Sequence, residues 1–359
     1  MPSFLCRDGV KMNRHGGYTG EKDNVLDFSV NINPLGMPEG LKQILAETIG
    51  ELNRYPEIDG RTALNVLSSF TKIPVNELIL GNGAIELIYL FARAVRPESA
   101  VLLTPAFNEY RRALEMNGCA NITEFVVSEQ EDFIADSEAF LDKIQETAPQ
   151  AVFICNPCNP TGVFIEPDIL REWIFKAPAD TIWFIDESFI DYSDSGGIGY
   201  EILTDRQIVL LRSLTKFYAL PGLRIGYAAG SPEIIRKMKD LKEPWTINAL
   251  ALKAAEYLPE TENFASQSRK FMKSERLRVE KALEDIHCIK AYPSRTDFHL
   301  IRSDRIPAQE LADRLLDYGI CVRTCEDFPG LGEKFIRTAV KLPEDNDRLI
   351  GALRQITEE

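Results

Sequence analysis

Residues 208–226 read IVLLRSLTKFYALPGLRIG. The apolar run Ile208–Leu211 predicts a buried strand, and the turn after it carries Ser213, Thr215 and Lys216. Burial disfavours the charged form of an amine and lowers its pKa, which is what Lys216 needs in order to attack an aldehyde. An isolated lysine after a strand is more often a surface residue, so the chemistry of Lys216 depends on what the rest of the chain brings to it.

The residues around Lys216 favour a phosphate. Ser213 and Thr215 supply two hydroxyl groups, and Arg224 follows eight residues after the lysine. Hydroxyl groups and a guanidinium are suited to binding a phosphate monoester. A lysine that attacks an aldehyde beside a phosphate site points to pyridoxal phosphate as the cofactor.

Length and composition are those of a globular protein. The chain has 359 residues, enough for two domains, with 45% hydrophobic and 27% charged residues. No apolar run approaches the roughly 18 residues of a membrane span, and the polar N-terminus lacks the apolar core of a signal peptide. The formal net charge of -14 argues against nucleic acid and anionic membranes as partners. We therefore expect a cytoplasmic protein that binds any anionic substrate through locally concentrated arginines and backbone N–H groups.

The seven cysteines are scattered through apolar segments, as expected for reduced thiols. Cys155 and Cys158 have the spacing of half a zinc site. No second pair and no suitably placed histidine completes the site, so we expect no metal.

Strand-like and helical segments alternate from about residue 60 to Lys216, which predicts an α/β fold with a largely parallel sheet covered on both faces. In such a sheet the residues just past the carboxyl ends of the strands share one crevice, where ligands bind. Phe107, Asn159 and Asp186 hold such positions, as Lys216 does. We therefore expect these four side chains to lie together.

The chemistry of these residues is complementary. Phe107 can stack on a flat ring, and Asp186 can keep a pyridine nitrogen protonated. Asn159 can donate to a phenolic oxygen. The turn Gly83-Ala84-Ile85 opens an apolar helix, whose unpaired N–H groups form an anion site. Asp186 alone would more often be a helix cap or a surface ion pair, so the joint pattern carries the argument.

The N-terminal segment offers further groups for an anion. Two glycines follow His15, so the backbone of Gly16 and Gly17 can wrap an anion to which His15 donates. A flexible loop with a solvated histidine is an equally good interpretation. Asn31 is also a candidate substrate ligand, although an asparagine that ends a strand-like run is more often a turn former.

The C-terminal third predicts a smaller α+β domain with two arginines in strands. Arg323 and Arg337 lie in strand-like segments, where an inward-facing charge must meet an anion, and Lys334 is nearby in sequence. Our hypothesis is that Arg323, Lys334 and His15 bind a substrate phosphate.

Six motifs of the chain occur in an order and at approximate spacings that can be compared with known families: Gly81-Asn82-Gly83, Asn159-Pro-Thr-Gly162, Asp186-Glu187, Ser213-Leu-Thr-Lys216, Arg224-Ile-Gly226 and Arg337. On these motifs, and over essentially its whole length, the chain resembles the fold-type I pyridoxal-phosphate enzymes of the class I/II aminotransferase superfamily. The resemblance implies a large domain with a mainly parallel seven-stranded sheet, plus a small α+β domain. It also implies Lys216 as the residue that bonds to the cofactor, Arg337 as the ligand of the substrate α-carboxylate, and a homodimer in which Tyr55 reaches the cofactor phosphate of the partner subunit.

Within the superfamily the chain resembles two groups, the L-threonine-O-3-phosphate decarboxylases of cobalamin synthesis and the histidinol-phosphate aminotransferases. The segments His15-Gly-Gly17, DFSVNINPLGMP and Glu243–Asn248 favour the decarboxylases. Phe189 does so too, because the aminotransferases usually have tyrosine three residues after the aspartate. The stretch between Gly17 and Leu26 is shorter than in the decarboxylases, which leaves open both the role of His15 and a close analogue such as serine phosphate as substrate. A non-catalytic module on the same fold is a third interpretation.

The expected organisation has three parts. Residues 1–50 form an N-terminal arm and part of the small domain, residues 51–250 the large cofactor-binding domain, and residues 251–359 the small C-terminal domain.

Overall fold

The computed structural model describes residues 15–358. The first 14 residues of the predicted N-terminal arm therefore lie outside the described residues. Within the described part of the chain, no helix combines the length and the apolar character needed to cross a membrane.

The centre of the large unit is a seven-stranded sheet with the strand order β2-β8-β7-β6-β5-β3-β4. Neighbouring strands pair in parallel from β7 to β4, while β8 is antiparallel to both β2 and β7. The prediction of a mainly parallel seven-stranded sheet is therefore confirmed. The strands are β2 (Leu78–Asn82), β3 (Ser99–Thr104), β4 (Asn121–Val126), β5 (Ala151–Cys155), β6 (Ile182–Asp186), β7 (Ile208–Ser213) and β8 (Ile225–Gly230).

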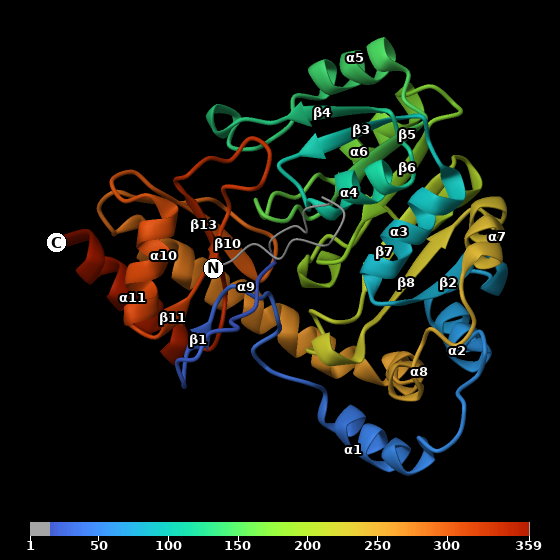
Figure 1. Ribbon diagram of the computed structural model, residues 1–359, viewed down its shortest axis with the longest axis horizontal. Coiled ribbons are helices and arrows are strands. Elements are labelled where there is room, and N and C mark those ends of the chain that lie inside the picture. Colours follow the sequence, from blue (N-terminus) through green and yellow to red (C-terminus); the bar gives the residue numbers. More distant parts are fainter. Residues whose placement is uncertain (1–14, 359) are drawn as a thin grey trace.

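Helices cover both faces of this sheet (Figure 1). Successive residues of a strand point to opposite faces. On β5, Val152 packs with the helices of one face and Phe153 with those of the other. The first face carries α1 (Glu39–Thr48), α2 (Arg61–Thr71), α5 (Ser137–Thr147), α6 (Pro167–Lys176) and α8 (Ala249–Glu256), and the second carries α3 (Ala84–Val95), α4 (Glu109–Met116) and α7 (Pro232–Leu241).

Local sequence determines where several of these helices begin. The Asp136 side chain accepts a hydrogen bond from the backbone N–H of Ala139, 2.8 Å away, and so caps α5. Asn248 caps α8 in the same way. Proline stands at the first position of α6 and α7, where its missing N–H has no helical partner to lose.

The small unit is built on a four-stranded antiparallel sheet of order β12-β13-β10-β9. Strand β1 (Leu26–Asp27) pairs in parallel with β11 (Ile320–Cys321), so the N-terminal segment joins this C-terminal unit. The domain boundaries at residues 50 and 250 stay a prediction. The remaining elements are β9 (Ile289–Ala291), β10 (Phe298–Ser303), β12 (Arg323–Thr324), β13 (Phe335–Ala339), α9 (Glu262–Glu284), α10 (Ala308–Asp317) and α11 (Pro343–Glu358).

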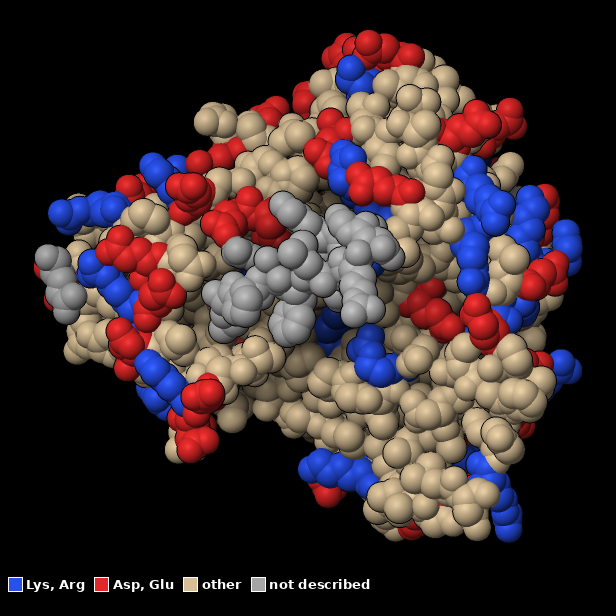
Figure 2. Space-filling view, viewed as in Figure 1, with Lys and Arg blue, Asp and Glu red and all other residues tan. Residues whose placement is uncertain are grey.

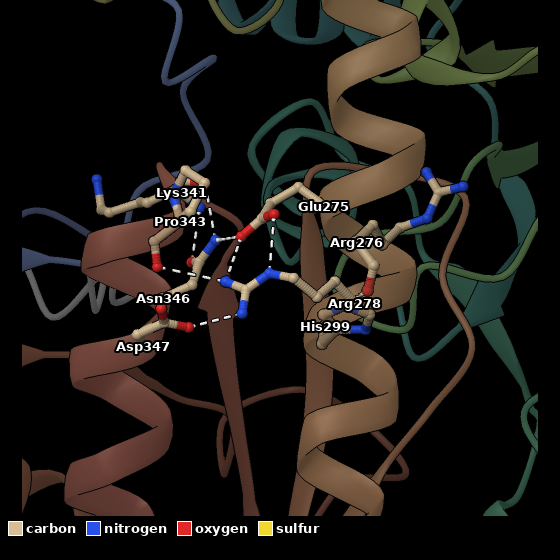
Figure 3. Close-up of polar contacts among 8 residues, drawn as sticks. All are labelled: Glu275, Arg276, Arg278, His299, Lys341, Pro343, Asn346 and Asp347. Atoms are coloured by element: carbon tan, nitrogen blue, oxygen red, sulfur yellow. Dashed lines mark hydrogen bonds and ion pairs between the residues drawn. The ribbon is translucent and has the colours of Figure 1, made fainter.

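A polar network fastens α11 to α9 (Figure 3). Arg278 donates through Nε and Nη2 to the two carboxylate oxygens of Glu275, at 3.0 and 2.7 Å. Its Nη1 donates to Asp347 at 2.6 Å. Asn346 Nδ2 donates to Glu275 Oε1 at 2.7 Å. These contacts satisfy the charge of the buried Glu275 from two elements, so they hold the small unit together.

Candidate active site

A cavity of about 550 Å³ lies at the carboxyl ends of the large sheet and is closed on one side by the small unit. Most of the residues that the sequence analysis proposed for the site line this cavity. From the large unit these are Ala84, Ile85, Phe107, Asn159, Asp186, Ser213, Thr215, Lys216 and Arg224, and from the arm and the small unit His15, Gly16, Asn31, Arg323 and Arg337.

Lys216 lies on the cavity wall, in the turn after β7. Its Nζ donates to Ser213 Oγ at 3.1 Å, and Ser213 Oγ is 2.9 Å from Thr215 Oγ1. Desolvation in the wall lowers the pKa of Lys216, while the nearby charge of Asp186 acts in the opposite direction. The amine is therefore closer to its neutral, nucleophilic form than a lysine in water.

The start of α3 and Arg224 form a cup suited to a phosphate. Gly83 caps the helix with φ 75°, and a Cβ there would lie 2.4 Å from Arg224 Nη2. Only glycine allows the guanidinium to approach the helix end so closely. Arg224 itself has φ 57°, a conformation that L-residues rarely adopt and that is typical of functional sites. N–H groups, a guanidinium and the hydroxyls of Ser213 and Thr215 thus converge there.

Asp186 ends β6 in a fully hydrogen-bonded position. Its Oδ2 accepts from Tyr110 Oη at 2.7 Å, and its Oδ1 accepts from the Ser188 N–H at 2.8 Å. The Phe107 ring stands edge-on to Tyr110, with 5.8 Å between the ring centroids. The carboxylate and the flat ring therefore lie on the same stretch of the cavity wall.

Arg337 and Asn159 form the side of the cavity toward the small unit. Arg337 Nη1 donates to Asn159 Oδ1, and its Nη2 donates to the Ser29 carbonyl at 2.8 Å. Because a guanidinium only donates, this contact orients the amide so that Asn159 Nδ2 can donate elsewhere. Burial lowers the pKa of Arg337 to about 10. A buried cation of this kind is stabilised by an anionic ligand.

Arg323 lines the same cavity beside Arg337, because the two residues are register partners on the neighbouring strands β12 and β13. Its Nη2 is held by both carboxylate oxygens of Asp327, at 2.9 and 2.7 Å. The sequence hypothesis did not include this pairing. An anion that binds Arg323 has to compete with Asp327.

Three predicted residues do not line the cavity. Gly83 stands directly before Ala84 and beside Arg224. Lys334 does not line the cavity either. It precedes β13 and its side chain is exposed, so the structure does not bring Lys334 to the site. Tyr55 is 86% exposed, and its ring lies 5.5 Å from that of Trp245 on the outer surface.

The first described residues of the N-terminal segment, His15 and Gly16, line the cavity. His15 Nε2 lies 3.1 Å from Glu109 Oε1, and the His15 ring is 5.9 Å from that of Phe107. Gly16 packs on the Ser29 backbone so closely that a Cβ would lie 2.2 Å from the carbonyl oxygen. Asn31 is buried, and its Oδ1 has no hydrogen-bond partner among the described residues.

Sequence reasoning missed several residues of the cavity wall. Tyr110, the partner of Asp186, could have been found, because it lies one helical turn after Phe107. Tyr89, Glu109 and Arg112 were not assigned to the site. Glu109 and Arg112 are an i,i+3 pair on α4, but only the packing of α3 and the arm against α4 brings Tyr89 and His15 to them.

The outer surface is unlike the cavity. On the face drawn in Figure 2, acidic and basic side chains are interspersed. The arginines that face the cavity are therefore the concentrated positive charge that the acidic composition led us to expect. Among residues 15–358, no group of three or more histidines, cysteines and acidic residues could hold a metal ion.

Residues 23–353 match the family described as aminotransferase class I and II. The chain belongs to this family. The resemblance inferred from the motifs is thereby confirmed, and the lysine, aspartate and arginine positions described above belong to a chain of this fold.

Known members of the family resemble this chain over most of its length. It is 34% identical to the threonine-phosphate decarboxylase of Salmonella typhimurium, over 93% of this chain and 92% of that protein. It is 32% identical to the adenosylcobalamin biosynthesis bifunctional protein CobDQ of Leptospira interrogans, over 92% of this chain and 39% of that protein. The crystal structure of the histidinol-phosphate aminotransferase from Clostridium acetobutylicum superimposes with a TM-score of 0.86 at 30% identity, covering 93% of this chain and 99% of that one.

Proposed function

We propose that this chain is a pyridoxal-phosphate-dependent carboxy-lyase. Its substrate would be L-threonine O-3-phosphate, whose decarboxylation gives aminopropanol phosphate for cobamide synthesis, or a close analogue such as O-phosphoserine, whose decarboxylation would give ethanolamine phosphate. The proposal is supported by the similarity to a threonine-phosphate decarboxylase and to a cobalamin biosynthesis protein. The observation that carries it is one cavity that combines Lys216, Asp186 and the phosphate cup with two further buried arginines, Arg323 and Arg337.

The residues present fit the cofactor. The end of α3, Ser213, Thr215 and Arg224 would hold its phosphate, because the cradle beside Gly83 is shaped by the guanidinium itself. Phe107 would stack on its ring, and Asn159 Nδ2 would donate to its phenolic oxygen. When bound, pyridoxal phosphate supplies an electron sink for the bond that breaks at the substrate Cα.

The protein's own groups control the protons. Asp186, fixed by Tyr110 and the Ser188 N–H, would keep a proton on the ring nitrogen of the cofactor. Lys216 Nζ, whose pKa is lowered by desolvation, would be the amine that bonds to the cofactor, and it can hold or release a proton at this position. After carbon dioxide has left, the same amine can return a proton to Cα.

The arginines would orient the substrate. Arg337 would bind the α-carboxylate, while Arg323 and His15 would bind the phosphate. Which Cα bond breaks depends on which one lies perpendicular to the ring of the cofactor, so the anchors of the two anionic ends decide the reaction. Arg323 would exchange Asp327 for the phosphate when the substrate binds.

An aminotransferase of the histidinol-phosphate type is the second candidate. The TM-score of 0.86 with such an enzyme at 30% identity favours it. Phe189 argues for the decarboxylase, since its ring lies 5.3 Å from Lys216 Nζ and offers no hydroxyl at that position. A phenol there would donate to the cofactor and tune it for amino transfer.

The deciding experiment is to add O-phospho-L-threonine to the purified holoenzyme without any keto acid. We expect equal amounts of carbon dioxide and aminopropanol phosphate. No release of either, together with amino transfer from histidinol phosphate to a keto acid, would reject the decarboxylase and support the second candidate.

The proposal includes a cytoplasmic homodimer with shared active sites. Tyr55 and Trp245 form an exposed aromatic pair, and Leu52 and Ile58 are also exposed nearby in sequence. Such a surface is suited to a second copy of the chain. Light scattering of the purified protein tests this, and a monomer with full activity would contradict it.

A further inference from the structure

Three side chains beside His15 have no role in the function proposed above. Glu109 is the first residue of α4 and only 4% exposed. Tyr89 Oη donates to Glu109 Oε2, and Arg112 donates to the same Tyr89 Oη. Arg112 Nη1 also lies 3.6 Å from Glu109 Oε2. All three residues line the cavity.

This cluster gives Glu109 a fixed position. Tyr89 comes from α3, whose N-terminus forms the phosphate cup, and Arg112 lies one turn further along α4. Burial and the hydrogen bond to Glu109 raise the pKa of Tyr89 to about 12, so its hydroxyl remains a donor at neutral pH. The carboxylate is therefore a rigid acceptor held by two helices.

His15 is the more exposed member of the pair, because its side chain is 49% exposed and it belongs to a segment without regular secondary structure. The same segment is tied on its other side to Ser29, whose Oγ accepts from the Gly17 N–H at 2.8 Å. The Ser29 carbonyl accepts from Arg337. His15, Glu109 and Arg337 therefore line the same cavity, and Ser29 connects the segment of His15 to Arg337.

We propose that Glu109 is a positioning residue that fixes His15 at the cavity mouth for the phosphate of the substrate. An imidazolium donates from both nitrogens, so a ring that gives Nε2 to Glu109 can give Nδ1 to a second anion. Arg112 offsets the charge of Glu109, which reduces its repulsion of the phosphate. The inference rests on the proposed function, because it requires a phosphorylated substrate.

The first test is Glu109→Gln in the holoenzyme. We expect KM for O-phospho-L-threonine to rise about tenfold, the effect of losing one charge-assisted hydrogen bond, while kcat and the absorbance of the bound cofactor change little. Glu115→Gln is the matched control. Glu115 lies on the same helix, is exposed, pairs with Arg111 at 3.2 Å and does not line the cavity.

Histidine NMR gives a readout that does not depend on turnover. The chain has three histidines, so His15→Gln identifies the His15 ring signal in holoenzyme carrying labelled histidine. We expect this signal to shift and saturate on addition of aminopropanol phosphate. Saturation should need about tenfold more product in Glu109→Gln and the same amount in Glu115→Gln.

Three outcomes would overturn the inference. The first is an unchanged KM and an unchanged saturation point in Glu109→Gln. The second is an equal rise in KM when Glu109→Gln is introduced into wild type and into the His15→Gln variant. Glu109 would then act on KM independently of His15. The third is a wild-type enzyme that decarboxylates O-phospho-L-threonine but whose His15 NMR signal does not shift when aminopropanol phosphate is added. Absence of decarboxylation altogether would instead reject the proposed function, and the inference with it.

A second variant covers a Glu109→Gln protein that fails to fold. Tyr89→Phe retains the carboxylate and removes one of its supports. It should raise KM about threefold, and only while His15 is present. An equal KM in Tyr89→Phe and wild type would then overturn the positioning role.

Discussion

Charged side chains are buried in two regions of the molecule, at the contact between α9 and α11 and in the wall of the cavity. The two regions differ in how many of the buried polar atoms have hydrogen-bond partners. In the first, both carboxylate oxygens of Glu275 and all three guanidinium nitrogens of Arg278 have protein partners (Figure 3). In the second, Arg337 Nε and Asn31 Oδ1 have no partner among the described residues. Buried polar groups without partners destabilise a fold. The cavity therefore retains binding capacity, whereas the helix contact uses its polar groups for stability.

Removal of the reactive lysine should have the largest effect. Lys216→Ala should lower turnover by more than about 1,000-fold, because no other amine can take its place at the cofactor. Thermal stability should not fall, since a partly desolvated amine is removed from the wall. Lys273→Ala, at an exposed ion pair on α9, is the control and should retain activity. Substantial turnover in Lys216→Ala would reject the site.

A second prediction uses the pH dependence of stability. Burial lowers the pKa of His299 to about 4, beside α9, and raises that of Asp297, near the cavity, to about 6. Between pH 4 and 6.5 the unfolded chain binds a proton at His299 that the folded chain does not, so this residue's contribution is lost as the pH falls. Asp297 acts with the opposite sign, because its folded form holds a proton that the unfolded form releases.

The two contributions therefore oppose each other between pH 4 and 6. Relative to wild type, His299→Gln should lose less stability on acidification, by up to about 3 kcal/mol, and Asp297→Asn should lose more. Denaturant unfolding at several pH values measures both. If the stability of both variants changed with pH in the same way, this would contradict the prediction that burial disfavours the charged forms of His299 and Asp297.

A matched pair of arginine substitutions compares the two regions directly. Arg337→Met should raise KM for the substrate about 100-fold with little loss of stability, because it removes a buried cation that awaits a carboxylate. Arg278→Met should leave KM unchanged and cost about 2 kcal/mol of stability, because it leaves Glu275 buried without its ion pair. Kinetics and unfolding curves of both variants suffice. A loss of stability in Arg337→Met equal to that in Arg278→Met would remove the distinction.

The parts of the site that the sequence predicted depend on local structure. Lys216, Ser213 and Arg224 follow from a strand, a turn and a second strand that are contiguous in the chain. Asp186 and Asn159 follow from the rule that strand ends of a parallel sheet share one edge. The family resemblance then supplied the sheet of seven strands, which the structure confirms.

The parts that could not be predicted depend on packing between distant segments. Glu109 meets His15 only because α4 and the arm are brought together, and no local pattern records this contact. Lys334 was placed with Arg337 on closeness in sequence alone, but it lies before β13 and is exposed, whereas Arg337 is buried in the strand and lines the cavity. Tyr55 is exposed on the surface of the single chain. Its proposed role requires a partner subunit, and neither the sequence nor the structure of one chain contains that subunit.

The smallest predicted effect concerns Arg323, which shares a property with each of the two regions. Its charge is paired, as at the helix contact, but its side chain lines the cavity. Arg323→Ala should raise KM for the phosphorylated substrate about tenfold and leave the cofactor absorbance unchanged. Asp327→Asn should act in the opposite direction and lower KM, since the phosphate would no longer compete for the guanidinium that Asp327 holds at 2.7 Å. KM values unchanged in both variants would make the pair a structural contact like that of Arg278, and would assign the substrate phosphate to His15 and the arm. Opposite shifts in the two variants would instead show that a residue can be fully paired in the free protein and still serve the ligand, provided that its partner is exchangeable.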